Sequence, residues 1–78
     1  MDGTLASIML FASNFAPRGW AFCEGQILSV ADNQALFSLL GTTYGGDGKT
    51  TFKLPSISHE NPDLHYIICV QGSFPSRS

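Results

Sequence analysis

Charged side chains are scarce in this chain of 78 residues: they make up 13% of the sequence, against 44% for apolar residues. Soluble domains usually carry about 25% charged residues. A surface with so little charge leaves apolar area uncovered, which favours contact with a partner over a solvated monomer. We expect residues 1–78 to form one small domain, and a domain of this size has only a thin margin of stability from its own core. Size and composition together predict self-association.

Basic residues are also few, and no long apolar run exists. The four basic side chains are scattered along the chain at Arg18, Lys49, Lys53 and Arg77, which argues against a patch that follows nucleic-acid phosphates. The longest apolar stretch, residues 8–12, is far shorter than the roughly 20 residues that cross a bilayer. The first residues lack the basic segment that opens a signal peptide. We expect no nucleic-acid partner, no membrane insertion and no Sec-type leader, so that a protein acting outside a cell would leave by particle assembly, lysis or a dedicated exporter.

Cysteine is limited to Cys23 and Cys69, 46 positions apart in apolar surroundings. No C-x-x-C or other paired-cysteine spacing is present. One interpretation is two buried free thiols that behave as small apolar side chains. The alternative is a disulfide between neighbouring strands, within one subunit or between two.

Apolar patterning predicts several short strands. The segments with this pattern are residues 4–12, 20–23, 51–57 and 65–71, and residues 26–28 lead onward from the second of them. The first is apolar on both faces, so we expect it either at the centre of a sheet or covered by another subunit. Pro55 makes residues 51–57 an edge or irregular strand. In residues 65–71 alternate positions fall on opposite faces, with Ile68 on one and Ile67 on the other.

One helix is predicted at about residues 30–40. Ser29 and Asp32 have the spacing of a capping box, and the apolar positions that follow are spaced for one helical face at Ala35, Leu36, Leu39 and Leu40. Gly41 follows where a left-handed C-cap is expected. The sequence therefore predicts a mainly β, α+β fold with one amphipathic helix.

The segment Gly48-Lys49-Thr50 superficially resembles a phosphate-binding loop. That motif requires a glycine five residues before its second glycine, and Thr43 occupies this position. The order of elements is also reversed, because a helix precedes the glycines and an extended segment follows them. We therefore interpret residues 45–48 as a turn with positive φ angles.

Candidate catalytic and metal-binding groups are sparse. His59, Glu60, Asp63 and His65 form the only local group of ligand-type side chains, and their spacing fits no metal-site pattern. No glycine-flanked serine with a G-x-S-x-G pattern is present. We expect no catalytic residues, no cofactor and no metal, and thus no enzymatic activity.

The aromatic residues allow two interpretations. Large rings fill the core or a subunit interface in a domain this small, and rings can also stack on sugars. For a binding module we predict a site among Trp20, Phe22, Tyr44, His59 and His65. For self-association we predict an interface made by Leu5, Ile8, Leu10, Phe11, Ile67, Cys69 and Phe74.

Most of the chain resembles the phage tail-collar domains and the related microcystin-dependent proteins. The matching segments are NFAP at 14–17, GWA at 19–21, CEGQ at 23–26, Asn33, ALF at 35–37, LGTTYGGDG at 40–48, TF at 51–52 and LP at 54–55. The end of the chain, with QGSFPSR at 71–77, is similar to the end of microcystin-dependent proteins. Many matches in one order make this resemblance far more specific than any single motif.

The resemblance implies a compact, mainly β domain with a helix in an oligomeric, often trimeric, tail fibre. Longer relatives place a large variable region after the LP segment, where receptor contact is expected, and here only residues 58–63 remain. We therefore expect a structural subunit, particle-associated or extracellular, whose partners are copies of itself and other tail or fibre proteins. The alternative is a small adhesin that binds a cell-surface receptor or glycan.

Overall fold

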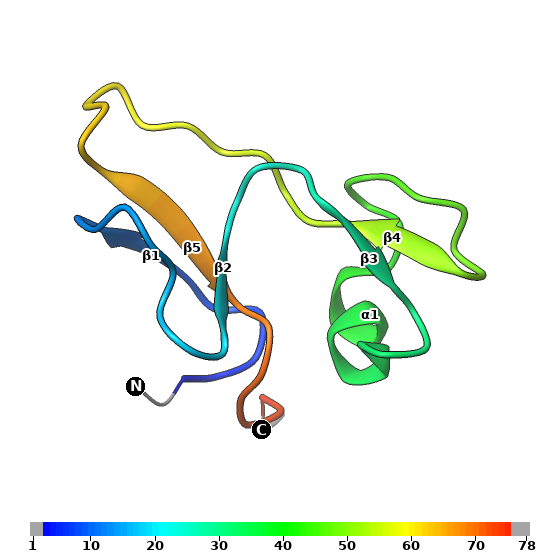
Figure 1. Cartoon of the computed structure of the whole chain (residues 1–78). Helices are drawn as coiled ribbons and strands as arrows, with labels where there is room; N and C mark the ends of the chain where they lie inside the picture. The colour runs from blue at the N-terminus through cyan, green and yellow to red at the C-terminus, as the bar shows by residue number, and fades with distance from the viewer. Residues whose placement is uncertain (1–2, 76–78) are drawn as a thin grey trace.

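The computed structural model describes residues 3–75, in which five short strands form two antiparallel sheets beside one helix (Figure 1). The predicted mainly β fold with one helix is therefore confirmed. The N-terminal residues 1–2 and the last residues of the predicted tail, including Arg77, lie outside the described part. No described helix is long and apolar enough to cross a membrane.

The larger sheet has the strand order β1-β5-β2. Its strands are β1 (Ile8–Phe11), β2 (Trp20–Phe22) and β5 (His65–Cys69). Both pairings are antiparallel, and Ile67 of β5 lies opposite Met9 on one side and Phe22 on the other. Strand β5, the last in the described residues, is thus the central one, and β1 and β2 form the edges of this sheet.

The central position of β5 explains its apolar sequence. Ile68 packs in one buried cluster with Leu5, Cys23, Leu36, Phe52 and Leu54. Ile67 and Cys69, on the opposite face, pack in a second cluster with Trp20. The predicted division of residues 65–71 into two apolar faces is confirmed, because each face of the strand is covered by its own cluster.

The smaller sheet pairs β3 (Ile27–Ser29) with β4 (Thr51–Lys53). Helix α1 (Gln34–Leu40) connects to the larger cluster through Leu36, which is fully buried. The strand ends at Lys53, and beyond it the pairing is irregular: the Leu54 N–H donates to the Gln26 carbonyl at 3.0 Å, and Glu24 forms an isolated bridge with Ser56. The prediction that residues 51–57 form an edge or irregular strand is confirmed.

The first strand is shorter than predicted. Ala6 has a φ of 70°, and the Ser7 N–H donates to the Thr4 carbonyl at 3.0 Å, so residues 4–7 form a turn. An extended strand over residues 4–12 is therefore wrong in its first half. A central position for this segment is also wrong, because β1 lies at the sheet edge.

The helix begins four residues later than predicted. Ser29 ends β3, and the Val30 N–H donates to the Thr50 carbonyl of the neighbouring chain segment at 3.0 Å. The first helical bond instead runs from the Phe37 N–H to the Asn33 carbonyl. The Ser29 hydroxyl only weakly accepts the Asp32 N–H, at 3.4 Å, and no side chain caps the helix. The predicted capping box is therefore wrong, since strand pairing holds Ser29 away from the helix start.

The helix ends at the predicted position, but the backbone angles of the residue after it differ from those of a left-handed C-cap. Gly41 follows α1, and its N–H donates to the Phe37 carbonyl at 2.7 Å. Its φ of 56° is positive, as expected, but its ψ of −143° lies outside the left-handed helical region. Ala35, which was predicted on the apolar face, is exposed.

Candidate functional site

A groove opens where the chain leaves β2 and changes its pairing partner. The Cys23 N–H donates to the Tyr66 carbonyl at 3.0 Å, while the Cys23 carbonyl accepts the Ile57 N–H at 2.9 Å. Cys23 is thus held by the start of β5 on one side and by the segment after β4 on the other. The side chains around these diverging segments line a groove of about 420 Å³.

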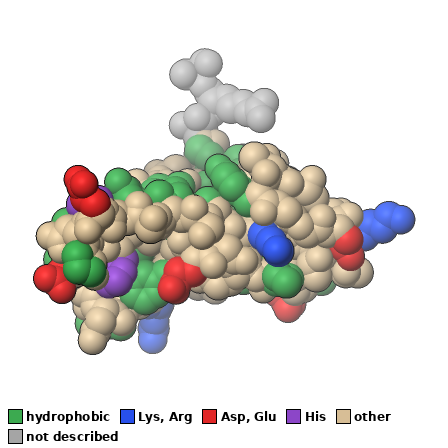
Figure 2. Space-filling model, turned by 90° about the horizontal axis from the view of Figure 1, so that it is seen from above, with side chains coloured by type: hydrophobic (Ala, Val, Ile, Leu, Met, Phe, Trp, Pro, Cys, Tyr) green, Lys and Arg blue, Asp and Glu red, His purple; other side chains and the backbone are tan. Residues whose placement is uncertain are grey.

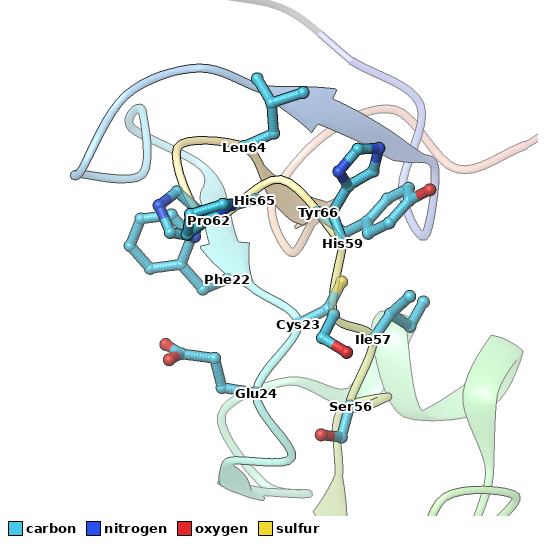
Figure 3. Close-up of a pocket in the computed structure, with 11 residues that line it drawn as sticks. Phe22, Cys23, Glu24, Ser56, Ile57, His59, Pro62, Leu64, His65 and Tyr66 are labelled. Carbon is cyan, nitrogen blue, oxygen red and sulfur yellow. The ribbon is translucent and has the colours of Figure 1, made fainter.

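Two pairs of rings flank the groove (Figure 3). The rings of Phe22 and His65 meet edge to face, with centroids 5.2 Å apart. The rings of His59 and Tyr66 lie 6.0 Å apart and are tilted by 51°. Figure 3 shows the two pairs on opposite sides of the view, with Cys23 and Ile57 below the pair of His59 and Tyr66. The remaining lining residues are Glu24, Ser56, Ser58, Pro62 and Leu64.

Local hydrogen bonds fix the loop that carries His59. The Nδ1 atom of His59 accepts the Asn61 N–H at 2.9 Å, and the side-chain oxygen of Asn61 accepts the Asp63 N–H at the same distance. The Leu64 N–H donates back to the Asn61 carbonyl. With Nδ1 occupied as an acceptor, the neutral His59 ring carries its proton on Nε2.

The groove has one formal charge among its lining residues. Glu24 contributes a carboxylate, and neither lysine nor arginine lines the groove in the described part of the chain. The backbone around Glu24 is held by Gln26, whose side chain accepts the Glu24 N–H at 3.0 Å and donates to the Phe22 carbonyl at 2.7 Å. Figure 2 shows histidine and acidic side chains beside hydrophobic ones at the end of the molecule that carries β1 and β5.

The groove brings together three of the five predicted binding residues, namely Phe22, His59 and His65. Trp20 does not reach it, because its side chain is only 8% exposed and packs against Ile67 and Cys69. Tyr44 is exposed but lies in the turn after α1, away from the groove residues. Of the five predicted binding residues, three therefore line the groove, Trp20 belongs to the core, and Tyr44 is exposed elsewhere on the surface.

Sequence reasoning missed Glu24 and Tyr66 as lining residues. Neither belongs to a local motif that marks a site. They meet only because Cys23 pairs with Tyr66 and residues 23–24 also pair with residues 56–57. The alternation of side chains in residues 65–71 could have placed Tyr66 on one face of a sheet. No sequence pattern could have shown that its ring lies beside the ring of His59.

The residues predicted for a subunit interface occupy two environments. Leu5, Ile67 and Cys69 lie inside the two clusters of this protomer. Ile8, Leu10 and Phe74 are exposed, and Phe11 is half-buried. Of the residues predicted for the interface, only Ile8, Leu10, Phe11 and Phe74 therefore have side chains that a partner could contact. Three of these four lie on β1.

The glycine-rich segment forms a turn organised by Asp47. The Oδ1 atom of Asp47 accepts the backbone N–H groups of Lys49, Thr50 and Thr51 at 2.8–2.9 Å. The Oδ2 atom accepts the Thr50 hydroxyl at 2.8 Å. These bonds, led by the one from the Thr51 N–H, hold the pKa of Asp47 well below its usual value. The interpretation as a turn is confirmed, and the chain's own carboxylate occupies the amides that a phosphate would need.

The two cysteines and the ligand-type side chains of residues 3–75 lie apart from one another. Cys23 and Cys69 are both buried and free, so the interpretation as two free thiols is confirmed and a disulfide within the chain is wrong. Burial raises the pKa of the Cys23 thiol. Within residues 3–75, no three histidine, cysteine, aspartate or glutamate side chains lie close enough to hold a metal ion.

Comparison with known proteins gives one positive result. Residues 6–62 match a family model described as Phage Tail Collar Domain. A search of the curated proteins found no match. The matched segment covers well over half of the chain and includes β1 to β4, α1 and most of the groove lining.

Proposed function

The chain belongs to the phage tail collar domain family, and we propose that it is a non-enzymatic structural subunit that self-associates in a phage-tail-like particle or an extracellular fibre. Membership of this family indicates a structural role in a phage tail, in association with other tail components. The proposal adds to this role that copies of the chain contact one another.

The observation that carries the proposal is the exposed apolar edge at β1. Ile8, Met9 and Leu10 are 41%, 40% and 38% exposed, and β1 is an outer strand of its sheet. Monomeric proteins protect such edges with charges, proline or bulges. The sequence of β1, IMLF, contains neither charge nor proline. The scarcity of charge in the whole chain points in the same direction.

Sedimentation velocity at micromolar concentrations tests this proposal. We expect the wild-type protein to sediment as an oligomer and the Ile8→Lys variant to shift towards the monomer, because a lysine at the edge would have to lose its hydration on association. Ile27→Lys is the matched control, since Ile27 is 63% exposed on the other sheet. A wild-type protein that stays monomeric at these concentrations would overturn the proposal.

A second candidate is a small module that binds a receptor or glycan through the groove. The observation in its favour is that Phe22, His59 and His65, all predicted as binding residues, line one groove with Tyr66. This function does not require association between copies of the chain.

A glycan array tests this second candidate. We expect binding that is lost in His59→Ala and retained in Tyr44→Ala, whose ring is exposed outside the groove. Trp20→Ala is unsuitable, because Trp20 is a core residue whose truncation would destabilise the fold. Binding that Tyr44→Ala abolishes and His59→Ala preserves would place the site elsewhere.

A further inference from the structure

We propose that the groove between β2 and the segment after β4 binds a positively charged side chain, arginine in preference to lysine, presented by a partner protein. This inference rests on the second proposed function for the use of the groove. It does not depend on self-association, because an isolated protomer already contains all the lining residues.

Charge complementarity selects a cation. Glu24 is the one formally charged residue among those that line the groove. The loop that carries His59 has two exposed acids outside the groove lining, Glu60 and Asp63, and neither lysine nor arginine. A phosphate, sulfate or carboxylate would meet repulsion here, since neither lysine nor arginine among residues 3–75 lines the groove to offset these charges. A cation in the groove would be attracted by the Glu24 carboxylate.

The ring pairs favour arginine over a simple ammonium. Phe22 and Tyr66 lie on opposite sides of the groove, each against an imidazole. A planar guanidinium stacks on aromatic faces and can form two parallel hydrogen bonds with one carboxylate. In Figure 3, Glu24 extends to the same side of the groove as Phe22. A guanidinium stacked on Phe22 would therefore lie on the side of the groove that carries the carboxylate.

The shape of the groove fits the stem of a long side chain. Ile57 and Leu64 are apolar parts of the lining, and the methylene groups of arginine pack on such surface while the charged head stays near water. A volume of about 420 Å³ is at the lower end of the range for small-ligand sites. The groove is thus large enough to hold one inserted arginine side chain.

The test compares two small probes that differ in charge. Nα-acetyl-arginine amide and its citrulline counterpart have nearly the same shape, but only the arginine compound is cationic. Each is titrated into ¹⁵N-labelled protein at pH 7 while amide signals are followed by NMR. We expect the arginine probe to shift the signals of Phe22, Glu24 and Tyr66, and the citrulline probe to bind at least about threefold more weakly.

Two variants distinguish the specific effect of the Glu24 carboxylate on binding from the effect of the protein's overall charge. Glu24→Gln should weaken the arginine probe roughly two- to fivefold, as expected for one exposed ion pair, and leave the citrulline probe unchanged. Asp32→Asn is the matched control, because Asp32 is an exposed acid outside the groove lining. This control should not change either affinity.

Three results would overturn the proposal. The first is equal binding of the two probes to the wild-type protein, which decides the question even if a variant does not fold. The second is an equal loss of arginine binding in Glu24→Gln and Asp32→Asn. The third is saturable binding of N-acetylglucosamine at the groove signals without any arginine binding, which would assign the groove to a sugar.

Discussion

The ring of Phe37 in α1 lies 5.3 Å from the ring of Phe52 in β4, with the two planes tilted by 56°. This contact attaches the helix to the smaller sheet, and Phe52 is at the same time a fully buried member of the larger cluster. Phe52 therefore links three parts of the molecule: the helix, its own sheet and the face of β5 that carries Ile68.

Phe52→Ala should be the most destabilising of the simple truncations. Removal of a fully buried phenylalanine costs about 3–5 kcal/mol, a large fraction of the roughly 4–12 kcal/mol expected for a domain of this length. Urea unfolding followed by circular dichroism measures the loss. Phe15→Ala is the control, because Phe15 is 63% exposed and should change the free energy of unfolding by less than about 0.5 kcal/mol. An equal loss of unfolding free energy in the two variants would contradict the burial of Phe52 in the core.

Gly46 should not tolerate a side chain. A Cβ at this position would lie 2.4 Å from the Phe52 Cα, and the residue has a φ of +100°. Gly41 also has a positive φ, but no atom lies within 4 Å of its Cβ position. We expect Gly41→Ala to cost about 1–2 kcal/mol from its conformation alone, and Gly46→Ala to cost more, since backbone must move as well. Thermal unfolding of both variants gives the comparison, and equal melting temperatures would be evidence against the turn geometry.

Asp47 should make stability depend on pH in the acidic range. Its folded pKa is lowered, chiefly by the hydrogen bond from the Thr51 N–H, so its stabilising effect is complete above the unfolded value of about 3.9. The effect is then lost progressively as the pH falls towards the folded pKa. Asp47→Asn should reduce the change in urea midpoint between pH 6 and pH 2.5. Asp32→Asn serves as the control, and a full acid dependence in Asp47→Asn would disprove the role of this carboxylate.

Both thiols should be protected in the folded protein. Cys23 and Cys69 are 3% and 0% exposed, and burial raises the pKa of Cys23, which lowers its thiolate fraction. A disulfide-exchange reagent should therefore label the native protein far more slowly than the protein in denaturant, where two thiols should react. Rapid labelling under native conditions would show that the clusters open. A mass lower by two protons in the untreated protein would show a disulfide instead.

The strand that the sequence predicted best is β5, in which apolar side chains alternate between two faces that are both buried. Residues 65–71 have apolar positions on both faces, and β5 is covered on each of them. Residues 4–12 have the same kind of pattern, yet Ala6 turns the backbone and β1 remains at an edge. An apolar pattern in the sequence predicts that both faces of a strand are apolar. It does not predict whether those faces are covered by the same protomer or by a partner.

The helix start shows a different limit. Ser29 and Asp32 have the spacing of a capping box, but Ser29 is paired opposite Thr51 in the smaller sheet. Pairing between segments more than twenty positions apart therefore overrides a signal that spans four residues. The groove has the same origin, because Glu24, His59 and Tyr66 come from three separate segments. Local motifs could predict the turn at Asp47, whose partners are two to four residues away, but not this site.

The position of β5 also determines when the larger sheet can form. β1 and β2 are both synthesised before β5, and neither pairs with the other. The sheet therefore cannot assemble from its first two strands, and their apolar side chains stay unpaired until β5 has been synthesised and has left the ribosome. Folding that depends on such distant contacts is comparatively slow, and incomplete chains expose apolar strands that promote aggregation. Synthesis of β5 is thus the step after which the larger sheet can form.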